Sequence, residues 1–376
     1  MTINDKLISA IREGNYEETV NCLLKGANVN YYDHGFTPLT ASINNHDARI
    51  SKLLLETERV SESELKSALS IAMSVKDKNI TKEVIKYMKD FKQGFMCTNK
   101  SFHKLAIDNK WPDILELMID KGAVFQKINS MDVNPLHYAA QQKDPIYVQI
   151  LGKTLPVDSY CDEEVTPLMV AAENGNTDTM DALLKLGANP NAQQKPRVKM
   201  NFLLPSILRA AVIASNLIDI DSVVHKATYS GNPKTIDVLL KYNPQLDLNK
   251  FGSGSKTPLM IAAEKGNHIM VHHLLKLGVN VNARNGNGNA LHFAIDGKSC
   301  EVAVLLLVYG INQNHRSNDY KTPLDKAIYQ TQKYGINHST LIAFLKYAKA
   351  HPKEVVCKKP VYFPGKGPRG PREDRE

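Results

Sequence analysis

The sequence predicts an all-α solenoid of about ten helix-turn-helix units with a helical insertion. Thr-Pro-Leu recurs along the chain, weaker copies fill the gaps at intervals near 33 residues, and apolar residues fall in the same slots of each copy. Repeats of this length are typical of units that cannot bury their apolar face alone and stack to form one continuous core. Taking the Thr position as the anchor of each unit, the anchors are Asp5, Thr37, Ser67, Ser101, Asn134, Thr166, Ser222, Thr257, Asn289 and Thr322.

Two slots indicate where each unit is buried. The second residue after the anchor is leucine in eight units, with His103 and Val224 as the exceptions. The fifth residue after it is alanine in nine units and Ser42 in the tenth. A residue this small at every copy predicts that two helices approach each other closely at this point.

Local signals divide each unit into helix, turn, helix and loop. Most anchors are Thr, Ser, Asn or Asp, whose side chains cap helix starts, and proline often follows at the first helical position. A glycine then ends the first helix, as at Gly14 and Gly175. A second helix with paired leucines, such as Leu23 and Leu24, is expected to turn both inward and to end at a left-handed glycine such as Gly26.

The repeat resembles the ankyrin-repeat family, whose unit carries the pattern T-P-L-H-x-A. The best copies run from Glu163 to Ala192 and from Ser255 to Arg284, and the resemblance covers about residues 3–350. It implies an ankyrin solenoid with polar capping units at both ends. It also implies that partners meet the loop tips and the exposed side of the first helix.

The interval of 56 residues between Thr166 and Ser222 divides the array. We expect ankyrin repeats 1 to 6 in residues 1–193, a helical insertion at 194–221 and repeats 7 to 10 in residues 222–350. The insertion has a basic opening and an apolar stretch, so it is either a degenerate half-repeat packed into the stack or an exposed flap.

Residues 351–376 form a basic tail with five prolines and three glycines, which is predicted not to fold. It is either a solvated tail or a linear motif for partner binding, targeting or secretion. Many asparagines, degenerate repeats and a basic tail also resemble ankyrin proteins that intracellular bacteria deliver into host cells.

Composition indicates the cellular compartment of the protein. The five cysteines are scattered without a C-x-x-C pair, which disfavours a disulfide framework and a structural zinc site and predicts a reducing compartment. The first fifteen residues lack an apolar stretch, and no run approaches the 18 apolar residues that span a bilayer. We therefore expect a monomer in the cytoplasm, or in the host cytoplasm if the protein is a delivered effector.

Reactive side chains give only weak patterns. Cys161 with His137, or Cys300 with His292, could form a nucleophile and base, but neither pair has an orienting residue or an oxyanion donor. His268 and His272 lie one helical turn apart without a third metal ligand. His137, His225 and His292 share one slot, which favours hydrogen bonding between neighbouring units. No catalytic residue, metal or cofactor is predicted.

Partner-binding candidates come from three slots: the residue before each anchor and the seventh and eighth residues after it. Across ten units these slots hold six basic and six acidic residues, which disfavours a nucleic-acid track despite a net charge of +8. The candidates are Phe36, Asn45, Val133, Gln142, Glu173, Asn174, Tyr229, Lys256, Glu264 and Tyr329.

We therefore predict a non-catalytic scaffold that binds a protein partner, whose identity the sequence does not give, on the concave surface, with no small-molecule substrate and no membrane span. The alternatives are an enzyme built on the scaffold with a Cys-His nucleophile, and a membrane or nucleic-acid tether acting through the tail.

Overall fold

The structure, a computed structural model, describes residues 2–89, 96–97, 100–123, 135–161, 164–194 and 220–355. The chain divides into two compact units. The first unit comprises residues 1–139 and 146–155, and the second comprises 140–145 and everything from Pro156 onward. Among the described helices, none is both long enough and apolar enough to cross a membrane.

Helix pairs make up both units. The first unit contains α1 (Ile3–Arg12), α2 (Tyr16–Leu24), α3 (Pro38–Asn44), α4 (Ala48–Glu56), α5 (Glu62–Ser74), α6 (Lys78–Tyr87), the short strands β1 (Met96–Cys97) and β2 (Lys100–Ser101), α7 (Phe102–Asp108), α8 (Pro112–Asp120), most of α9 (Pro135–Ala140), and α10 (Ile146–Leu151). The second unit contains α11 (Pro167–Glu173), α12 (Thr177–Lys185), α14 (Val223–Ser230), α15 (Pro233–Tyr242), α16 (Pro258–Glu264), α17 (His268–Lys276), β3 (Arg284–Asn285), β4 (Gly288–Asn289), α18 (Ala290–Asp296), α19 (Cys300–Val308), α20 (Pro323–Tyr334), α21 (Ser339–Ala350) and α22 (Pro352–Val355).

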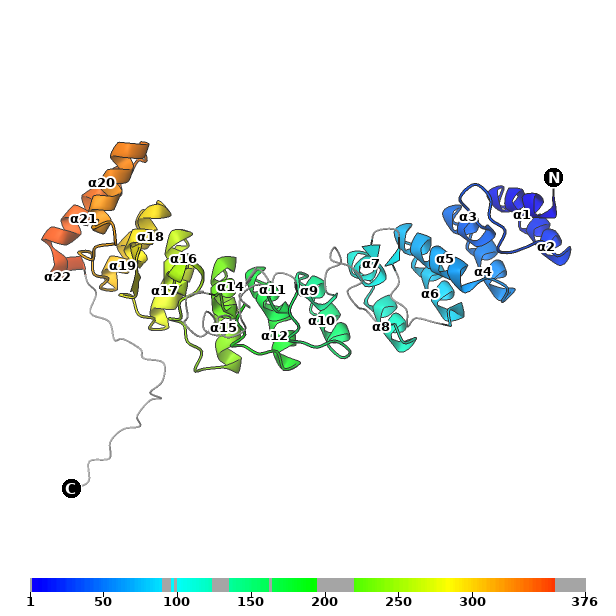
Figure 1. Cartoon of the computed structure of the whole chain (residues 1–376), viewed down its shortest axis with the longest axis horizontal. Helices are drawn as coiled ribbons and strands as arrows, with labels where there is room; N and C mark the ends of the chain where they lie inside the picture. The colour runs from blue at the N-terminus through cyan, green and yellow to red at the C-terminus, as the bar shows by residue number, and fades with distance from the viewer. Residues whose placement is uncertain are drawn as a thin grey trace, which may run out of the picture. The chain divides into compact units, whose positions relative to one another are not determined.

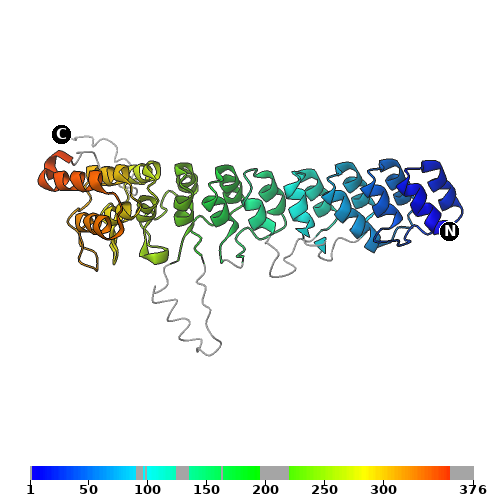
Figure 2. The ribbon, with the colours of Figure 1, turned by 90° about the horizontal axis from the view of Figure 1, so that it is seen from above.

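Two helical layers run through each unit (Figures 1 and 2). In the second unit, each first helix packs on the next along the series α11, α14, α16, α18 and α20. The second helices do the same along α12, α15, α17, α19 and α21. The predicted all-α ankyrin-type solenoid is therefore confirmed, and each two-stranded hairpin is antiparallel.

The small-residue slot is buried in every repeat. Its nine alanines and Ser42 are each at most 5% exposed, as close helix packing requires. Ser42 adds a hydrogen bond of 2.8 Å to the hydroxyl of Ser51 on the paired helix. This contact satisfies a hydroxyl that would otherwise be costly to bury.

Helix capping follows the prediction at the units that carry Thr-Pro. Thr37, Thr166, Thr257 and Thr322 are N-caps, each accepting from the backbone amide three residues later. The prediction is wrong at the anchors Asp5 and Ser67. The first helix is capped by Thr2, with Asp5 as its capping-box partner, and Ser67 lies inside a longer α5 that Ser61 caps.

The expected inward pair of leucines is wrong at Leu24, whose side chain is 83% exposed. Counting from the anchors, Leu24 occupies the slot that holds Lys185, Lys241 and Lys276 in other units. This slot faces away from the stack. Cys22 and Leu23 take the two inward slots instead, and both are buried.

The terminal helix pairs, which are expected to be polar capping units, carry some exposed aromatic and aliphatic side chains. In the first helix pair, Leu24 and Tyr16 are exposed, and in the last pair Tyr334 and Tyr347 are exposed.

The two segments that flank the insertion are hydrogen bonded to each other. Gln193 and Ser222 form an isolated antiparallel bridge, and the Gln194 amide donates to the Asp221 carbonyl at 2.8 Å. The helix pairs on either side are direct neighbours, because α11 packs on α14 and α12 on α15. Most of the insertion (195–219) and of the tail (356–376) lies outside the described residues, so the division at residue 193 stays a prediction. The start of the tail, which is predicted not to fold, instead forms the short helix α22.

Candidate partner-binding surface

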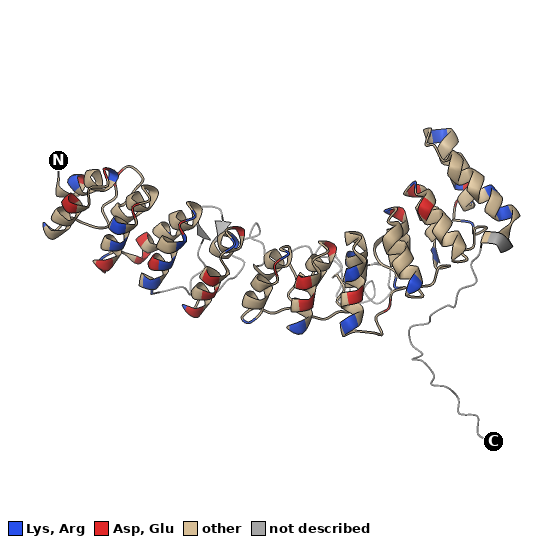
Figure 3. Cartoon of the chain, turned by 180° about the vertical axis from the view of Figure 1, so that it is seen from behind, with Lys and Arg blue, Asp and Glu red and all other residues tan. Residues whose placement is uncertain are grey.

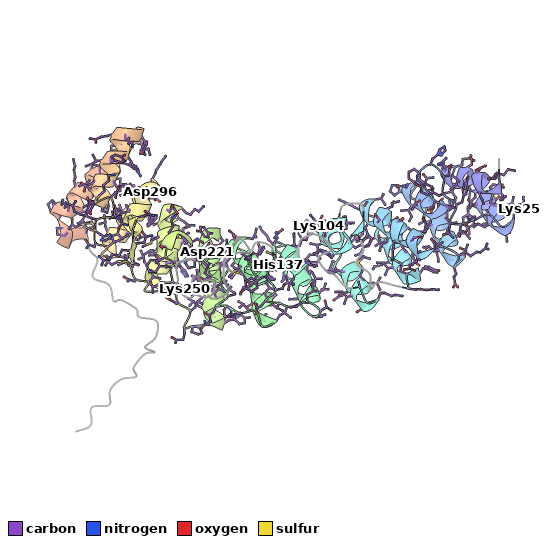
Figure 4. All side chains as sticks on the ribbon, viewed as in Figure 1. Lys25, Lys104, His137, Asp221, Lys250 and Asp296 are labelled. Atoms are coloured by element: carbon purple, nitrogen blue, oxygen red, sulfur yellow. The ribbon has the colours of Figure 1, made fainter. Side chains whose placement is uncertain are left out.

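In the second compact unit, the first helix of each repeat carries one side chain of a continuous row. The seventh residue after each anchor stands in the last turn of its first helix, except in the longer α20, where it lies mid-helix. The row reads Glu173, Tyr229, Glu264, Asp296 and Tyr329, and we call it the seventh-slot row. Figure 4 labels Asp296 near the end of α18, and Figure 3 shows basic and acidic residues interspersed on these helices.

Each carboxylate of the row binds a lysine. The Lys226 ammonium lies 3.3 Å from a Glu173 oxygen. Lys256 donates to both oxygens of Glu264, at 2.8 and 2.7 Å.

The third pair joins two helix pairs. Lys326 of α20 donates to Asp296 of α18 at 2.6 Å, and Gln330 donates to the other Asp296 oxygen at 2.9 Å. The three acidic side chains are thus neutralised within the fold.

Two lysines lie close to the ring of Tyr229. The Nζ atoms of Lys226 and Lys265 lie 5.8 and 5.9 Å from its ring centroid, within the range of a cation–π interaction. Burial raises the pKa of the Tyr229 hydroxyl to about 12. The ring therefore stays neutral at physiological pH.

Tyr329 has the same arrangement. Lys321 lies 3.9 Å from its ring centroid, and Lys333 donates to its hydroxyl at 2.6 Å. This hydrogen bond from Lys333 is the main cause of the lowered pKa of Tyr329. The neighbouring ring of Tyr334 meets Tyr329 edge-on, with centroids 6.0 Å apart.

A cleft of about 440 Å³ opens beside the row, between the first helices α16, α18 and α20 and the loops that precede α18 and α20. Charged side chains line it together with Phe293, which the Lys256 ammonium covers at 5.4 Å from the ring centroid. Asp319 is one of its lining residues, and hydrogen bonds from Lys321 and Ser317 lower the Asp319 pKa to about 2. The cleft therefore offers paired charges rather than an apolar hollow.

Buried histidines hold the loops that form this cleft. Through Nδ1 His292 binds its own cap residue Asn289 at 2.8 Å, and Nε2 reaches the Lys321 carbonyl of the next loop at 3.1 Å. His225 bridges in the same way from Ser222 to the carbonyls of Lys250 and Lys256. The predicted hydrogen bonding between neighbouring repeats is confirmed for these two residues.

The predicted partner residues of the first unit are placed differently. Phe36 is 38% exposed beside its anchor. The side-chain amide of Asn45 donates to the carbonyls of Ile11 and Arg12, where it closes the end of α1. Val133 lies outside the described residues.

Two polar candidates of the second unit make contacts within the fold. The carbonyl of Gln142 accepts from Asn176 and Thr179. The side chain of Asn174 donates to the Val170 carbonyl one turn earlier. The candidates Glu173, Tyr229, Lys256, Glu264 and Tyr329 lie together on the row described above.

The slot analysis omitted three residues that complete this surface: Lys226, Phe293 and Lys326. All three are the fourth residue after their anchor, one turn before the seventh-slot row. Including the fourth slot in the sequence analysis would have found them.

The candidate reactive groups make ordinary contacts. Both ring nitrogens of His292 are hydrogen bonded, so neither is free to act as a base for Cys300. His268 pairs with Glu301 at 3.5 Å, and His272 meets the Tyr309 ring. Over the part of the chain that the structure describes, no three His, Cys, Asp or Glu residues are placed to hold a metal ion.

Stacked helix pairs, left-handed glycine turns and capped Thr-Pro helix starts define a helix-turn-helix repeat solenoid. The chain belongs to the ankyrin-repeat family. The family model for ankyrin repeats matches it in three copies, at residues 102–194, 205–285 and 224–317, which together span more than half of the chain.

Individual relatives agree with this assignment. An ankyrin repeat protein of Fowlpox virus (strain NVSL) is 32% identical over 114 residues, which are 30% of this chain and 33% of that protein. The human transient receptor potential cation channel subfamily A member 1 is 23% identical over 184 residues, 47% of this chain and 14% of the channel. The chain thus spans a third or less of these relatives.

A solved structure shows the same fold. The ankyrin repeat domain of human ASB11 superposes with a TM-score of 0.51 at 22% identity, covering 66% of this chain and 97% of that domain.

Proposed function

We propose that this protein is a non-catalytic scaffold that binds a protein partner along the seventh-slot row and the cleft beside it, on the face expected to be concave. The observation that supports it is the row of lysine-paired carboxylates and lysine-flanked tyrosines on successive first helices. Rigid rings surrounded by satisfied polar groups are typical of protein interfaces.

Site-specific photo-crosslinking tests this proposal. A photo-reactive phenylalanine analogue replaces Tyr229 or Tyr329 in the full chain, and the control position is Ile269, an exposed residue of the second helix α17. In cell lysate we expect adducts of discrete mass from the two tyrosine positions and few from Ile269. Equal adduct patterns from all three positions would refute this choice of surface.

The absence of catalysis is part of the proposal, since relatives of this family include proteins named as a palmitoyltransferase and a ubiquitin ligase. Cys300 stands at the start of α19, and both ring nitrogens of His292, its candidate base, are hydrogen bonded elsewhere. We expect Cys161 and Cys300 to be labelled by a maleimide no faster than a free thiol in a peptide. Much faster labelling of either would favour the enzyme alternative.

We also propose a reducing, cytoplasmic setting, in the host cell if the protein is a delivered effector. The thiols of Cys22, Cys161 and Cys300 are free, which supports this setting. Fractionation of the producing cells, and of any host cells, tests it, and recovery from the culture medium alone would count against it. Removing residues 356–376 tests the tether alternative, and we expect crosslinking from Tyr229 to persist.

A further inference from the structure

We propose that the partner presents an extended acidic segment with two carboxylate clusters about eight residues apart, one binding at Tyr229 and the other at Tyr329. This inference rests on the proposed function and specifies the chemistry of the partner. Two groups of side chains carry it: the Tyr229 station, made of Tyr229, Lys226 and Lys265, and the Tyr329 station, made of Tyr329, Lys321 and Lys333.

Each station holds one lysine in excess. Lys226 pairs with Glu173 and Lys321 pairs with Asp319. Lys265 and Lys333 are exposed, and among the described residues neither forms an ion pair with a carboxylate. Each lies instead against the tyrosine of its station. A carboxylate of the partner would therefore find, beside an aromatic ring, an ammonium group that has no carboxylate partner among the described residues.

The surface between the stations is neutral. Two ion pairs occupy this surface, Lys256 with Glu264 and Lys326 with Asp296. Each pair has no net charge. The complementary segment therefore carries its negative charge in two clusters rather than along its whole length.

The stations lie three steps apart along the stack, on α14 and α20, with α16 and α18 between them. Packed helices lie about 8–10 Å apart, so three steps give roughly 24–30 Å. An extended chain rises about 3.3 Å per residue and covers this distance in about seven to nine residues.

The same arrangement disfavours a nucleic acid. A nucleic-acid strand carries a phosphate at every nucleotide, so it would place negative charge over Glu264 and Asp296 as well as over the stations. A polypeptide can leave these positions uncharged.

Fluorescence anisotropy with the full chain tests the inference. The probe is a labelled synthetic peptide with two Glu-Glu pairs whose centres lie about eight residues apart in a Gly/Ser chain. Matched probes carry the pairs about four residues apart or replace Glu with Lys, and a fourth probe is a single-stranded DNA of similar length. We expect the first probe to bind most tightly and to weaken as salt is raised.

The double variant Lys265→Ala with Lys333→Ala is expected to weaken binding of the first probe about tenfold. The control double variant, Lys276→Ala with Lys346→Ala, removes the same charge from the second helices α17 and α21 and is expected to leave binding unchanged. Circular dichroism checks that both variants keep their helices.

Four results overturn the inference: equal binding of the short-spaced peptide, tighter binding of the DNA, equal weakening by the two double variants, or no binding of the first probe. If the first probe does not bind but crosslinking from Tyr229 still yields discrete adducts, the scaffold function stands and only the acidic chemistry of the partner is wrong.

Discussion

Among single residues, two buried ionisable side chains, Glu64 and His292, have pKa values that are shifted in opposite directions. Glu64, at the start of α5, accepts a hydrogen bond from the hydroxyl of the anchor Thr37 in the preceding helix pair. Burial raises the Glu64 pKa, although the bond from Thr37 opposes this. His292 shows the opposite sign, because burial lowers its pKa to about 4.

Glu64 makes the first unit sensitive to rising pH. Its folded pKa lies above the reference value of 4.5, so its stabilising contribution is present below pH 4.5 and is lost as pH rises through the folded pKa. We expect Glu64→Gln to remove this loss. The urea midpoint followed by the fluorescence of Trp111, the only tryptophan, reports the first unit. An equal pH slope in the variant would contradict the assignment to Glu64.

His292 makes the second unit sensitive to falling pH. Its folded pKa of about 4 lies below the reference 6.5, so the contribution is present above pH 6.5 and is lost as pH falls toward 4. At most about 3 kcal/mol depends on this one group. We expect hydrogen exchange of α18, corrected for intrinsic rates, to accelerate between pH 7 and about 5. In His292→Gln the acceleration should be smaller.

At the scale of helices, the small-residue slot limits how closely two helices pack. Ala262 on α16 is fully buried against its neighbours. We expect Ala262→Leu to destabilise the second unit by about 1–3 kcal/mol, because a larger side chain forces the helices apart. Thermal unfolding followed by circular dichroism measures the loss. Ala343→Leu on the exposed side of α21 is the matched control, and an equal loss there would show that close packing is not the cause.

At the scale of the whole molecule, stability is expected to be a sum of helix pairs and the interfaces between neighbours. The effect of Ala262→Leu should therefore remain within the second unit. We expect the circular-dichroism transition to shift while the Trp111 fluorescence transition, which reports the first unit, stays at the wild-type urea concentration. A joint shift of both signals would indicate one cooperative unit over the whole chain.

The repeat pattern predicted the helices better than their ends. Ala72 and Leu69 of the third helix pair are buried in their expected slots, although the helix starts five residues before its anchor Ser67. Slot spacing reports which face is buried, whereas the start depends on which nearby side chain caps it, here Ser61. Leu24 shows the same limit, because a leucine pair alone does not say which member faces the core.

Slot counting also predicts only part of the candidate surface. Glu173, Tyr229, Lys256, Glu264 and Tyr329 follow from slot counting. The lysines that neutralise two carboxylates of the row, Glu173 and Asp296, do not, because Lys226 and Lys326 come from the next helix along the stack and occupy the fourth slot. Sequence separations of up to 53 residues join these pairs.

The order of the amino acids by itself determined the repeat, its helix pairs and its buried faces, because periodicity and small-residue slots are local properties of the chain. Only the tertiary structure decided which charges cancel and which lysines remain available at the two tyrosines. Those facts depend on distances between side chains of neighbouring units, which no single repeat contains.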